Sequence, residues 1–249
     1  MRSCIAFAKC LFFILWSALL VPVQWIWLFF ANSRNAYTIP HLWQKGVCFI
    51  FRISVNVSNK PMQSASCLYV SNHISYLDIP VIGSVLKASF VAKEEVRNWP
   101  VFGFLSTLQQ TAFIKRNRSA ASEGTSELNN FLKDGKNLIL FPEGTTSNGT
   151  EVLPFKSSFF QVATTGNVQH VQPFTVKINQ VNGIEPVIQS DYDIYAWHGD
   201  MDLAPHLWKF AKSKGAVIDL VFHDSLTLSA NSDRKTLCNH SYEKVKSPY

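Results

Sequence analysis

The feature that most constrains this chain is a stretch near its N-terminus without a charged side chain. No Asp, Glu, Lys or Arg occurs between Lys9 and Arg34, and the run from Leu11 to Phe30 is almost entirely apolar. About 20 such residues in a helix are enough to cross a hydrocarbon core of ~30 Å. The run therefore predicts an uncleaved membrane anchor, which either spans the bilayer or lies within one leaflet.

A cleaved signal peptide is the competing interpretation of this run. The apolar part of a signal peptide covers only about 7–15 residues and ends at a small-x-small site. This run is longer, and no clear site of that kind follows it. Trp25 and Trp27 suit a membrane interface, and a membrane helix tolerates the kink at Pro22. These features favour the anchor.

The segment Ile39–Ile53 mixes apolar and polar residues, and it predicts a second helix. That helix either lies on the membrane or belongs to the folded domain, and the sequence favours neither. Basic residues are more frequent after the apolar run than before it: Arg34, Lys45, Arg52 and Lys60 follow it, whereas Arg2 and Lys9 precede it. The positive-inside rule then places the domain on the cytoplasmic side of the inner membrane.

The composition excludes intrinsic disorder, which needs low hydrophobicity and high charge. The 249 residues are 47% hydrophobic and 16% charged, and the net charge is +6. A basic excess suits a lipid surface, a phosphate ester or a nucleic acid, although many soluble proteins are also basic. A nucleic-acid binder would cluster basic and aromatic residues, and no such cluster is visible. The five cysteines form no C-x-x-C pair, so we expect reduced thiols rather than disulfides or a zinc site.

From about residue 66, short apolar runs alternate with helix-like stretches, which predicts strands alternating with helices. The predicted strands are Cys67–Val70, Ser89–Ala92, Thr111–Ile114, Asn137–Phe141, Val171–Ile178 and Ala216–Phe222. The predicted helices are Ile79–Lys87, Val101–Gln109, Ser119–Lys133, Ser157–Thr165 and Leu203–Lys212. The fold class is therefore α/β, with a mixed sheet flanked by helices and preceded by an N-terminal hydrophobic membrane helix or helix pair.

Three regions follow from this pattern. Residues 1–55 form the anchor region, 56–228 the α/β domain, and 229–249 a polar, basic tail that is frayed or partly helical. In open α/β sheets, ligand sites gather in loops at the carboxyl ends of strands. Two such loops are chemically unusual, at residues 71–73 and 142–146.

The first of these loops places His73 five residues before Asp78. In a regular helix that offset is about 140° around the axis, so a contact between the two needs an irregular turn. In such a turn the carboxylate would fix the imidazole tautomer and make the histidine a general base. Taken alone, one His near one Asp is common, and a structural role is the better interpretation.

Four blocks of sequence change that balance, because they resemble the motifs of PlsC-type glycerolipid acyltransferases in order and spacing. The blocks are Asn72–Asp78, Phe113–Arg116, Phe141–Thr145 and Val171–Phe174. Two positions depart from the family pattern. Gln110 stands where the second block has glycine, and Thr146 stands where the third block carries a cation. The acceptor is therefore less well defined than the reaction type.

The resemblance implies roles for individual residues. His73 and Asp78 are the expected catalytic pair, and no separate serine nucleophile is implied. Arg116 is the expected ligand of an anionic headgroup, with Phe113 in the same block. Glu143 is expected to orient Arg116, a lipid hydroxyl or a backbone amide. Gly144 is expected to let the main chain approach closely, and Thr145 is expected to bind substrate. Lys156 is either a second headgroup cation or a solvated lysine at a helix start.

The implied reaction moves a fatty acyl group from acyl-CoA or acyl-carrier protein to the free hydroxyl of a lysolipid. No cofactor or metal is implied. The expected acceptor is 1-acylglycerol-3-phosphate, which gives phosphatidic acid, and the alternative is a lyso-ornithine lipid. A catalytically silent lipid-binding protein is a remote alternative, because it would have no chemical need for both His73 and Asp78.

A later segment, Tyr195–Asp202, holds one histidine and two aspartates. Aspartates two residues apart beside one histidine are a weak pattern for a metal site. With the residues that follow it, as far as Trp208, the segment resembles a subgroup that includes lyso-ornithine-lipid acyltransferases. This resemblance, with the missing cation at Thr146, favours the amino-acid-containing acceptor, whereas Arg116 favours the phosphate.

Overall fold

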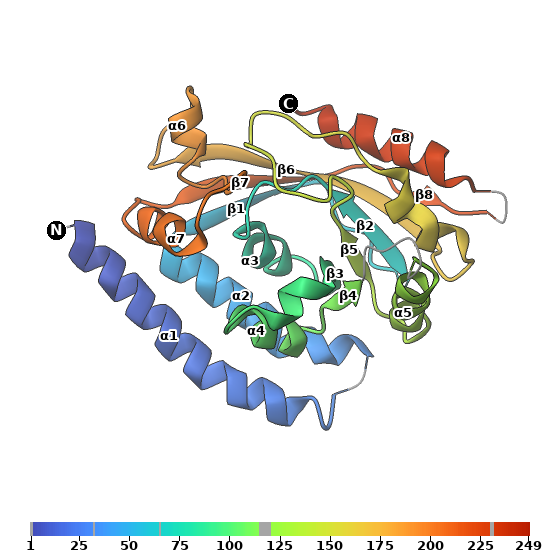
Figure 1. The fold of residues 1–249 in the computed structure, drawn as a ribbon, viewed down its shortest axis with the longest axis horizontal. Coiled ribbons are helices and arrows are strands. Elements are labelled where there is room, and N and C mark those ends of the chain that lie inside the picture. Colours follow the sequence, from blue (N-terminus) through green and yellow to red (C-terminus); the bar gives the residue numbers. More distant parts are fainter. Residues whose placement is uncertain (1, 32, 65, 115–120, 230–231) are drawn as a thin grey trace.

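The structure is a computed structural model that describes residues 2–31, 33–64, 66–114, 121–229 and 232–249. Across these residues, eight strands form one mixed sheet in the order β1-β7-β6-β2-β5-β3-β4, and β8 pairs with β6 (Figure 1). The strands are β1 (Ile53–Ser58), β2 (Cys67–Ser71), β3 (Ser89–Lys93), β4 (Ala112–Ile114), β5 (Leu138–Leu140), β6 (His170–Val181), β7 (Ala216–Phe222) and β8 (Leu226–Thr227). Neighbours pair in parallel except where β6 meets β7 and β8.

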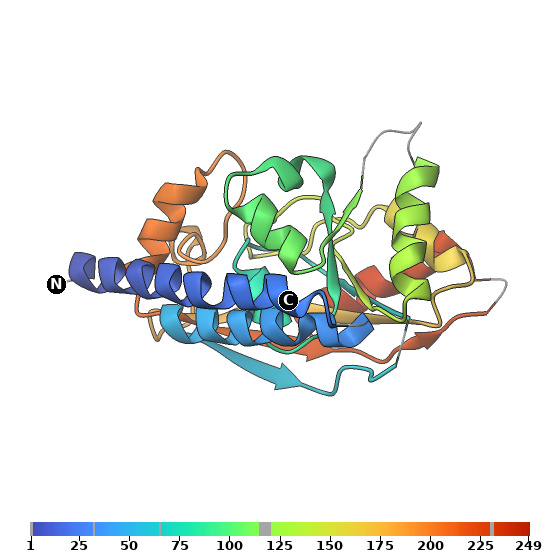
Figure 2. The ribbon, with the colours of Figure 1, turned by 90° about the horizontal axis from the view of Figure 1, so that it is seen from below.

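Helices cover both faces of this sheet. The α-helices are α1 (Arg2–Trp27), α2 (Thr38–Phe51), α3 (Asp78–Gly83), α4 (Phe102–Leu108), α5 (Ala121–Lys133), α6 (Gln189–Tyr192), α7 (Leu203–Ala211) and α8 (Arg234–Lys246). The 3₁₀ helices among the described residues are η1 (Ser33–Tyr37), η2 (Glu94–Asn98) and η4 (Ser157–Thr164). Figures 1 and 2 show α1 and α2 side by side on one side of the sheet, with α8 on the other.

The α/β fold and its mixed sheet are confirmed, and all six predicted strands are present within one or a few residues. The structure also contains strands β1 and β8, which the sequence does not predict. The expected domain boundary, between residues 55 and 56, falls inside β1. The helix expected at 157–165 is a 3₁₀ helix. The helix expected at 79–87 begins and ends earlier, at Asp78 and Gly83.

Alternation along the central strands sends side chains into a separate core on each face. In β2, Cys67 and Tyr69 join the core beneath α2 and α3, whereas Leu68 and Val70 join the core beneath α5, η4 and α8. All four are at most 2% exposed. Because both faces are covered, the central strands read as continuous apolar runs, which explains why the sequence predicts them well.

Helix α1 is docked along its length. Its Lys9 Nζ donates to the carbonyl of Ser213 at 3.0 Å, and its Gln24 Nε2 donates to the carbonyl of Leu108 at 2.8 Å. Between them, Trp16 Nε1 donates to the carbonyl of Trp43 in α2 at 3.1 Å. Gly46 of α2 makes this approach possible, because a Cβ there would lie 2.2 Å from the Trp16 indole nitrogen. Helix α2 therefore connects α1 to the domain as one of its core helices.

The C-terminal tail, expected to be frayed or partly helical, is a packed helix. Helix α8 buries one face against β6 and η4, through Leu237, Cys238, Ser241 and Val245. After the helix, the Tyr249 hydroxyl donates to the carbonyl of Val176 in β6 at 2.7 Å. The expected fraying is wrong, because these contacts attach the segment to the central strand.

Candidate active site

The turn between β2 and α3 brings His73 and Asp78 into contact. His73 Nδ1 lies 2.8 Å from Asp78 Oδ2. The same oxygen accepts the backbone N–H groups of Ile74 at 2.7 Å and Ser75 at 3.0 Å. The main chain therefore curls around the carboxylate, and this is the irregular turn that the five-residue spacing requires.

Asp78 is completely enclosed by donors. Its side chain is 0% exposed, and its second oxygen, Oδ1, accepts the Tyr195 hydroxyl at 3.0 Å. A buried carboxylate with four donors is fixed in position and keeps its charge compensated. Tyr195 is a partner that the His73 motif does not predict, because 117 residues separate it from Asp78.

The His73 ring is oriented from two sides. The carboxylate accepts a hydrogen bond from Nδ1–H, which fixes the tautomer and leaves Nε2 as the basic nitrogen. The ring stacks on Phe141 with centroids 4.1 Å apart and planes at 10°. The His73 side chain is 19% exposed and lines a cavity, so its basic nitrogen belongs to a rigid group that substrate can reach.

Glu143 supports the same turn from the end of β5. Its Oε2 accepts the backbone N–H of His73 at 2.9 Å, and its Oε1 accepts that of Leu153 at 2.8 Å. Arg116, a lipid hydroxyl and a backbone amide are the expected partners of Glu143, and the structure shows two backbone amides in this role. Burial raises the pKa of Glu143 to about 8, although both backbone donors favour the charged form. Gly144 follows with φ of 74°, a left-handed conformation that glycine adopts without strain.

Asn72 fixes the point where the chain leaves β2. Its side-chain amide donates to the carbonyl of Val176 at 2.8 Å and accepts the Val176 N–H at 2.9 Å. The amide also donates to the Tyr249 hydroxyl at 3.1 Å. The residue before His73 is thus held to β6 as if it were part of the sheet.

A cavity of about 460 Å³ opens beside His73. Its walls are mostly apolar and come from α1, α2, α3, α4 and β3; they include Phe13, Leu20, Val47, Phe90, Phe102 and Leu105. Near His73 the wall becomes polar, with Gly144, Thr145 and Thr146. The cavity therefore suits a ligand with a long apolar part and a polar group near the imidazole.

Comparison with known families agrees with this geometry. A family model described as Acyltransferase matches residues 52–177. The chain belongs to the acyltransferase family. The match contains all four sequence blocks, from the turn after β2 to the middle of β6.

The individual relatives are named for two different acceptor lipids. The chain is 33% identical over 234 residues to a lyso-ornithine lipid O-acyltransferase of Brucella abortus, with 91% of this chain and 87% of the relative covered. It is 29% identical over 217 residues to a 1-acyl-sn-glycerol-3-phosphate acyltransferase of Neisseria meningitidis, with 86% and 81% covered. The crystal structure of the 1-acyl-sn-glycerophosphate acyltransferase PlsC from Thermotoga maritima has the same fold, with a TM-score of 0.71, 21% identity, and 100% and 96% covered.

The cavity is lined by some of the expected substrate-binding residues and not by others. Gly144 and Thr145 line the cavity. Phe113 is 2% exposed in β4, beneath the Arg97 guanidinium at 4.6 Å, and does not line it. Lys156 is exposed, precedes η4 and also lies off the cavity wall. Arg116 lies outside the described residues.

The two departures from the family motifs have structural counterparts. Gln110 has φ of 65°, so this position is left-handed, and a glycine would adopt it without a steric cost. The Gln110 amide oxygen also accepts Lys136 Nζ at 3.3 Å. Thr146 lies on the cavity wall, where it presents a hydroxyl in place of a cation.

Among the described residues, which include the Tyr195–Asp202 segment, no group of three or more His, Cys, Asp or Glu side chains is arranged to hold a metal ion. His198 Nε2 pairs with Asp193 Oδ1 at 3.1 Å, away from the cavity wall. The segment contacts the turn between β2 and α3, where the Trp197 N–H donates to the carbonyl of Ile74 at 3.0 Å. Trp197 and Gly199 also line the cavity.

Proposed function

We propose that this acyltransferase transfers a fatty acyl group from a thioester to the free hydroxyl of a lysolipid. The observation that carries the proposal is His73, whose Nδ1 is held by buried Asp78 and whose ring faces an apolar cavity. A lysolipid combines a long apolar chain with a hydroxyl, and the cavity combines apolar walls with a polar region near the imidazole.

In the proposed reaction, His73 Nε2 accepts the proton of the lysolipid hydroxyl. The hydroxyl oxygen attacks the thioester carbonyl, an ester C–O bond forms, and the C–S bond breaks. The imidazolium then returns its proton to the departing thiolate. Asp78 stabilises the imidazolium, a role that suits a buried, hydrogen-bonded carboxylate. A general base of this kind contributes roughly 10²–10⁴ in rate, and positioning contributes further.

Lyso-ornithine lipid is the acceptor that we place first. The relatives that carry this name match over 80–92% of the chain at 29–33% identity. Thr146 on the cavity wall supports the same choice, because a hydroxyl suits a zwitterionic headgroup better than a phosphate. This order reverses the expectation from sequence. Lysophosphatidic acid is the second candidate, supported by the 29% identical relatives that act on it by name. The donor is acyl-CoA or acyl-carrier protein.

We place the enzyme on the inner membrane with its domain facing the cytoplasm. Helix α1 is long and apolar enough to cross a membrane, at a mean hydropathy of 2.3. Its bonds to the domain at Lys9 and Gln24 are about 22 Å apart along the helix axis, at 1.5 Å per residue. A helix so attached at both ends lies flat against the domain, which supports insertion into one leaflet rather than a span.

The exposed apolar side chains support this placement. Phe7, Phe12 and Leu15 of α1 are 55–66% exposed, and Phe104 of α4 is 55% exposed. Such a surface is costly in water and stable in lipid. Because α1 and α4 also line the cavity, a lysolipid could enter from the leaflet without leaving it.

The test is an acyl-transfer assay with the purified protein in phospholipid vesicles. Acyl-CoA and acyl-carrier protein are offered in parallel, each with lyso-ornithine lipid or lysophosphatidic acid. We expect transfer to lyso-ornithine lipid with the higher kcat/KM. Greater turnover of lysophosphatidic acid would reverse the choice of acceptor, and no transfer to either acceptor, with the thioester intact, would reject the enzyme.

His73→Ala is expected to lower turnover by roughly 10²–10⁴, because the base is removed. His198→Ala is the matched control, because His198 pairs with Asp193 away from the cavity wall. Its activity should stay near that of the parent protein. Full activity in the His73 variant would remove this residue from the mechanism.

A further inference from the structure

Asp78 receives one hydrogen bond from outside its own motif. Its Oδ2 accepts hydrogen bonds from His73, Ile74 and Ser75, which all lie within five residues of Asp78 in the sequence. Its Oδ1 accepts the Tyr195 hydroxyl at 3.0 Å. Without that hydroxyl, Oδ1 would stay buried and lose this donor. A buried carboxylate oxygen without a donor is unfavourable, so the Tyr195 bond is a strong constraint on the carboxylate.

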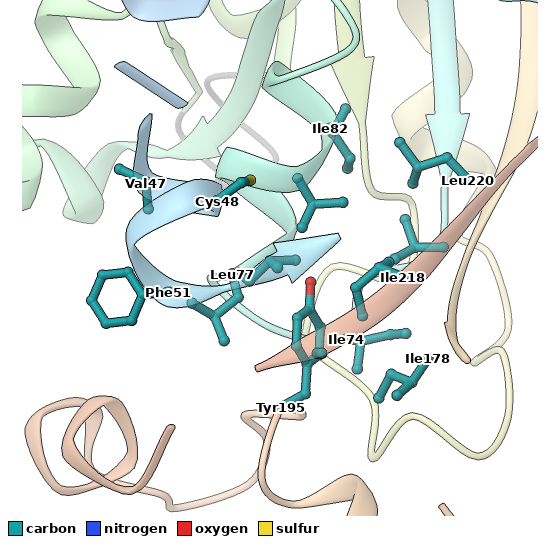
Figure 3. Packing of buried hydrophobic residues seen from close by; sticks show 14 of the residues in the cluster. Val47, Cys48, Phe51, Ile74, Leu77, Ile82, Ile178, Tyr195, Ile218 and Leu220 are labelled. Atoms are coloured by element: carbon teal, nitrogen blue, oxygen red, sulfur yellow. The ribbon is translucent and has the colours of Figure 1, made fainter. Parts of the chain in front are cut away.

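The position of Tyr195 is itself fixed by packing. The side chain is 0% exposed and stands among Ile74, Leu77 and Ile218, with its oxygen directed into the cluster (Figure 3). Its ring meets Phe210 of α7 edge-on, with centroids 5.9 Å apart. Two residues later, the Trp197 N–H donates to the carbonyl of Ile74. This bond attaches the segment that contains Tyr195 to the turn between His73 and Asp78.

We propose that Tyr195 is a positioning residue of the acyl-transfer reaction, which acts by holding the Asp78 carboxylate against His73. The inference rests on the proposed roles of His73 and Asp78. Tyr195 does not line the cavity, so its effect passes through Asp78 rather than through substrate. The Tyr195 hydroxyl that holds Asp78 thus comes from a residue 117 positions later in the chain.

Burial and the nearby Asp78 charge keep the Tyr195 hydroxyl protonated, so that it donates a hydrogen bond. Burial raises the pKa of Tyr195 well above its ordinary value, and the Asp78 charge raises it further. The titratable groups that face Asp78 and Tyr195 come from four places: His73 of the turn, Glu143 after β5, Cys48 of α2 and Tyr249 after α8. Tyr195 is the partner that donates to Oδ1, and its hydroxyl offsets part of the carboxylate charge.

Tyr195→Phe isolates this hydroxyl, because phenylalanine keeps the ring and its contact with Phe210. We expect kcat to fall about tenfold or more, since a bond to a charged group is lost, with KM for donor and acceptor changed less than about twofold. We also expect the acid limb of the pH–kcat profile to move to higher pH. With one donor fewer, the Asp78 carboxylate stabilises the His73 imidazolium more strongly, so the base is lost at higher pH.

The matched control is Tyr192→Phe, which removes a half-buried hydroxyl three residues earlier. It should leave kcat and the acid limb unchanged. A double-mutant cycle with Asp78→Asn adds a second readout: if Tyr195 acts through Asp78, Tyr195→Phe costs little in the Asp78→Asn background. Full additivity in that cycle would overturn the proposal.

Thermal unfolding of each variant separates positioning from folding. A fall in kcat that follows a lower melting temperature, with the acid limb in place, indicates a structural role and overturns the proposal. A parent-like kcat and acid limb in Tyr195→Phe also overturn it. If the parent protein transfers no acyl group to either acceptor, the proposed function fails instead, so the two failures are distinguishable.

Discussion

At the scale of single residues, the turn between β2 and α3 is held by side chains that bond to the backbone. Asp78 accepts two backbone N–H groups of the turn, Asn72 bonds to both main-chain groups of Val176, and Glu143 accepts the N–H of His73. These carboxylate and amide groups replace the regular pairing that ends with β2. The imidazole can therefore be rigid although the chain around it is irregular.

Glu143 should make the stability of the protein depend on pH. Its pKa is raised in the folded state from 4.5 to about 8 because the carboxyl is buried. The folded state then binds the proton more tightly than the unfolded state. The stabilisation from this proton is complete below pH 4.5 and is lost as pH rises through 8. The limiting slope is about 1.4 kcal/mol per pH unit.

The measurement compares the parent protein with Glu143→Gln, whose side chain does not titrate. We expect the free energy of unfolding of the parent to fall relative to that of the variant between pH 5.5 and 7.5. Glutamine can supply one acceptor for two backbone donors, so the variant starts from a lower stability at acidic pH. A difference that is constant across this range would show that Glu143 does not titrate there.

The sequence predicts the local part of the site and misses the distant part. His73, Asp78 and Glu143 belong to short motifs, and the five-residue spacing predicts the irregular turn that the structure shows. Tyr195 lies in the segment that resembles the lyso-ornithine-lipid subgroup, but nothing in that resemblance connects it with Asp78, 117 residues away. Its partnership with Asp78 exists only after β6, α6 and α7 have folded around the turn.

At the scale of elements, burial decides which segments the sequence predicts. Strands β2 and β5 are fully buried and appear as continuous apolar runs. Strand β1 lies at the edge of the sheet and is mostly exposed after its first residue, so its sequence resembles a loop. The charges of α8 conceal a buried face, although its members at 237, 238, 241 and 245 follow helical spacing.

The attachment of α1 to α4 depends on one side chain. Gln24 is 3% exposed, and its Nε2 donates to the carbonyls of Ala36 at 3.1 Å and Leu108 at 2.8 Å. Gln24→Leu keeps the size of the side chain but leaves both carbonyls without this donor. We expect the protein to lose about 1–3 kcal/mol of stability, measured by chemical unfolding in detergent.

The control for this substitution is Val23→Ala, one residue earlier on the exposed side of α1. It should change stability by less than about 0.5 kcal/mol. Equal stability of Gln24→Leu and the parent protein would mean that these bonds do not dock α1. In that case the docking of α1 would rest on its other contacts, such as the Lys9 and Trp16 bonds.

At the scale of the whole molecule, one helix lines the cavity with one face and exposes apolar side chains on the other. The inner face of α1 contributes Phe13 and Leu20 to the cavity, while its outer face presents Phe7 and Phe12. Figure 2 shows α1 running along α2 rather than projecting from the domain. If α1 lies in one leaflet, the acyl chain of a bound lysolipid passes from lipid into protein beside His73.

This arrangement predicts that both ends of α1 lie on the same side of the membrane as the domain. Cys4 is exposed near the start of α1, and Lys235 is exposed on α8, which covers the opposite face of the sheet (Figure 1). In a variant with Cys10→Ser and Lys235→Cys, a membrane-impermeant maleimide should label both remaining exposed cysteines from the same side. In inverted vesicles the maleimide should label both cysteines. In intact spheroplasts it should label neither until detergent is added. Labelling of Cys4 in spheroplasts, with position 235 protected, would require α1 to span the bilayer; the bonds from Lys9 to Ser213 and from Gln24 to Leu108 would then have to break in the membrane.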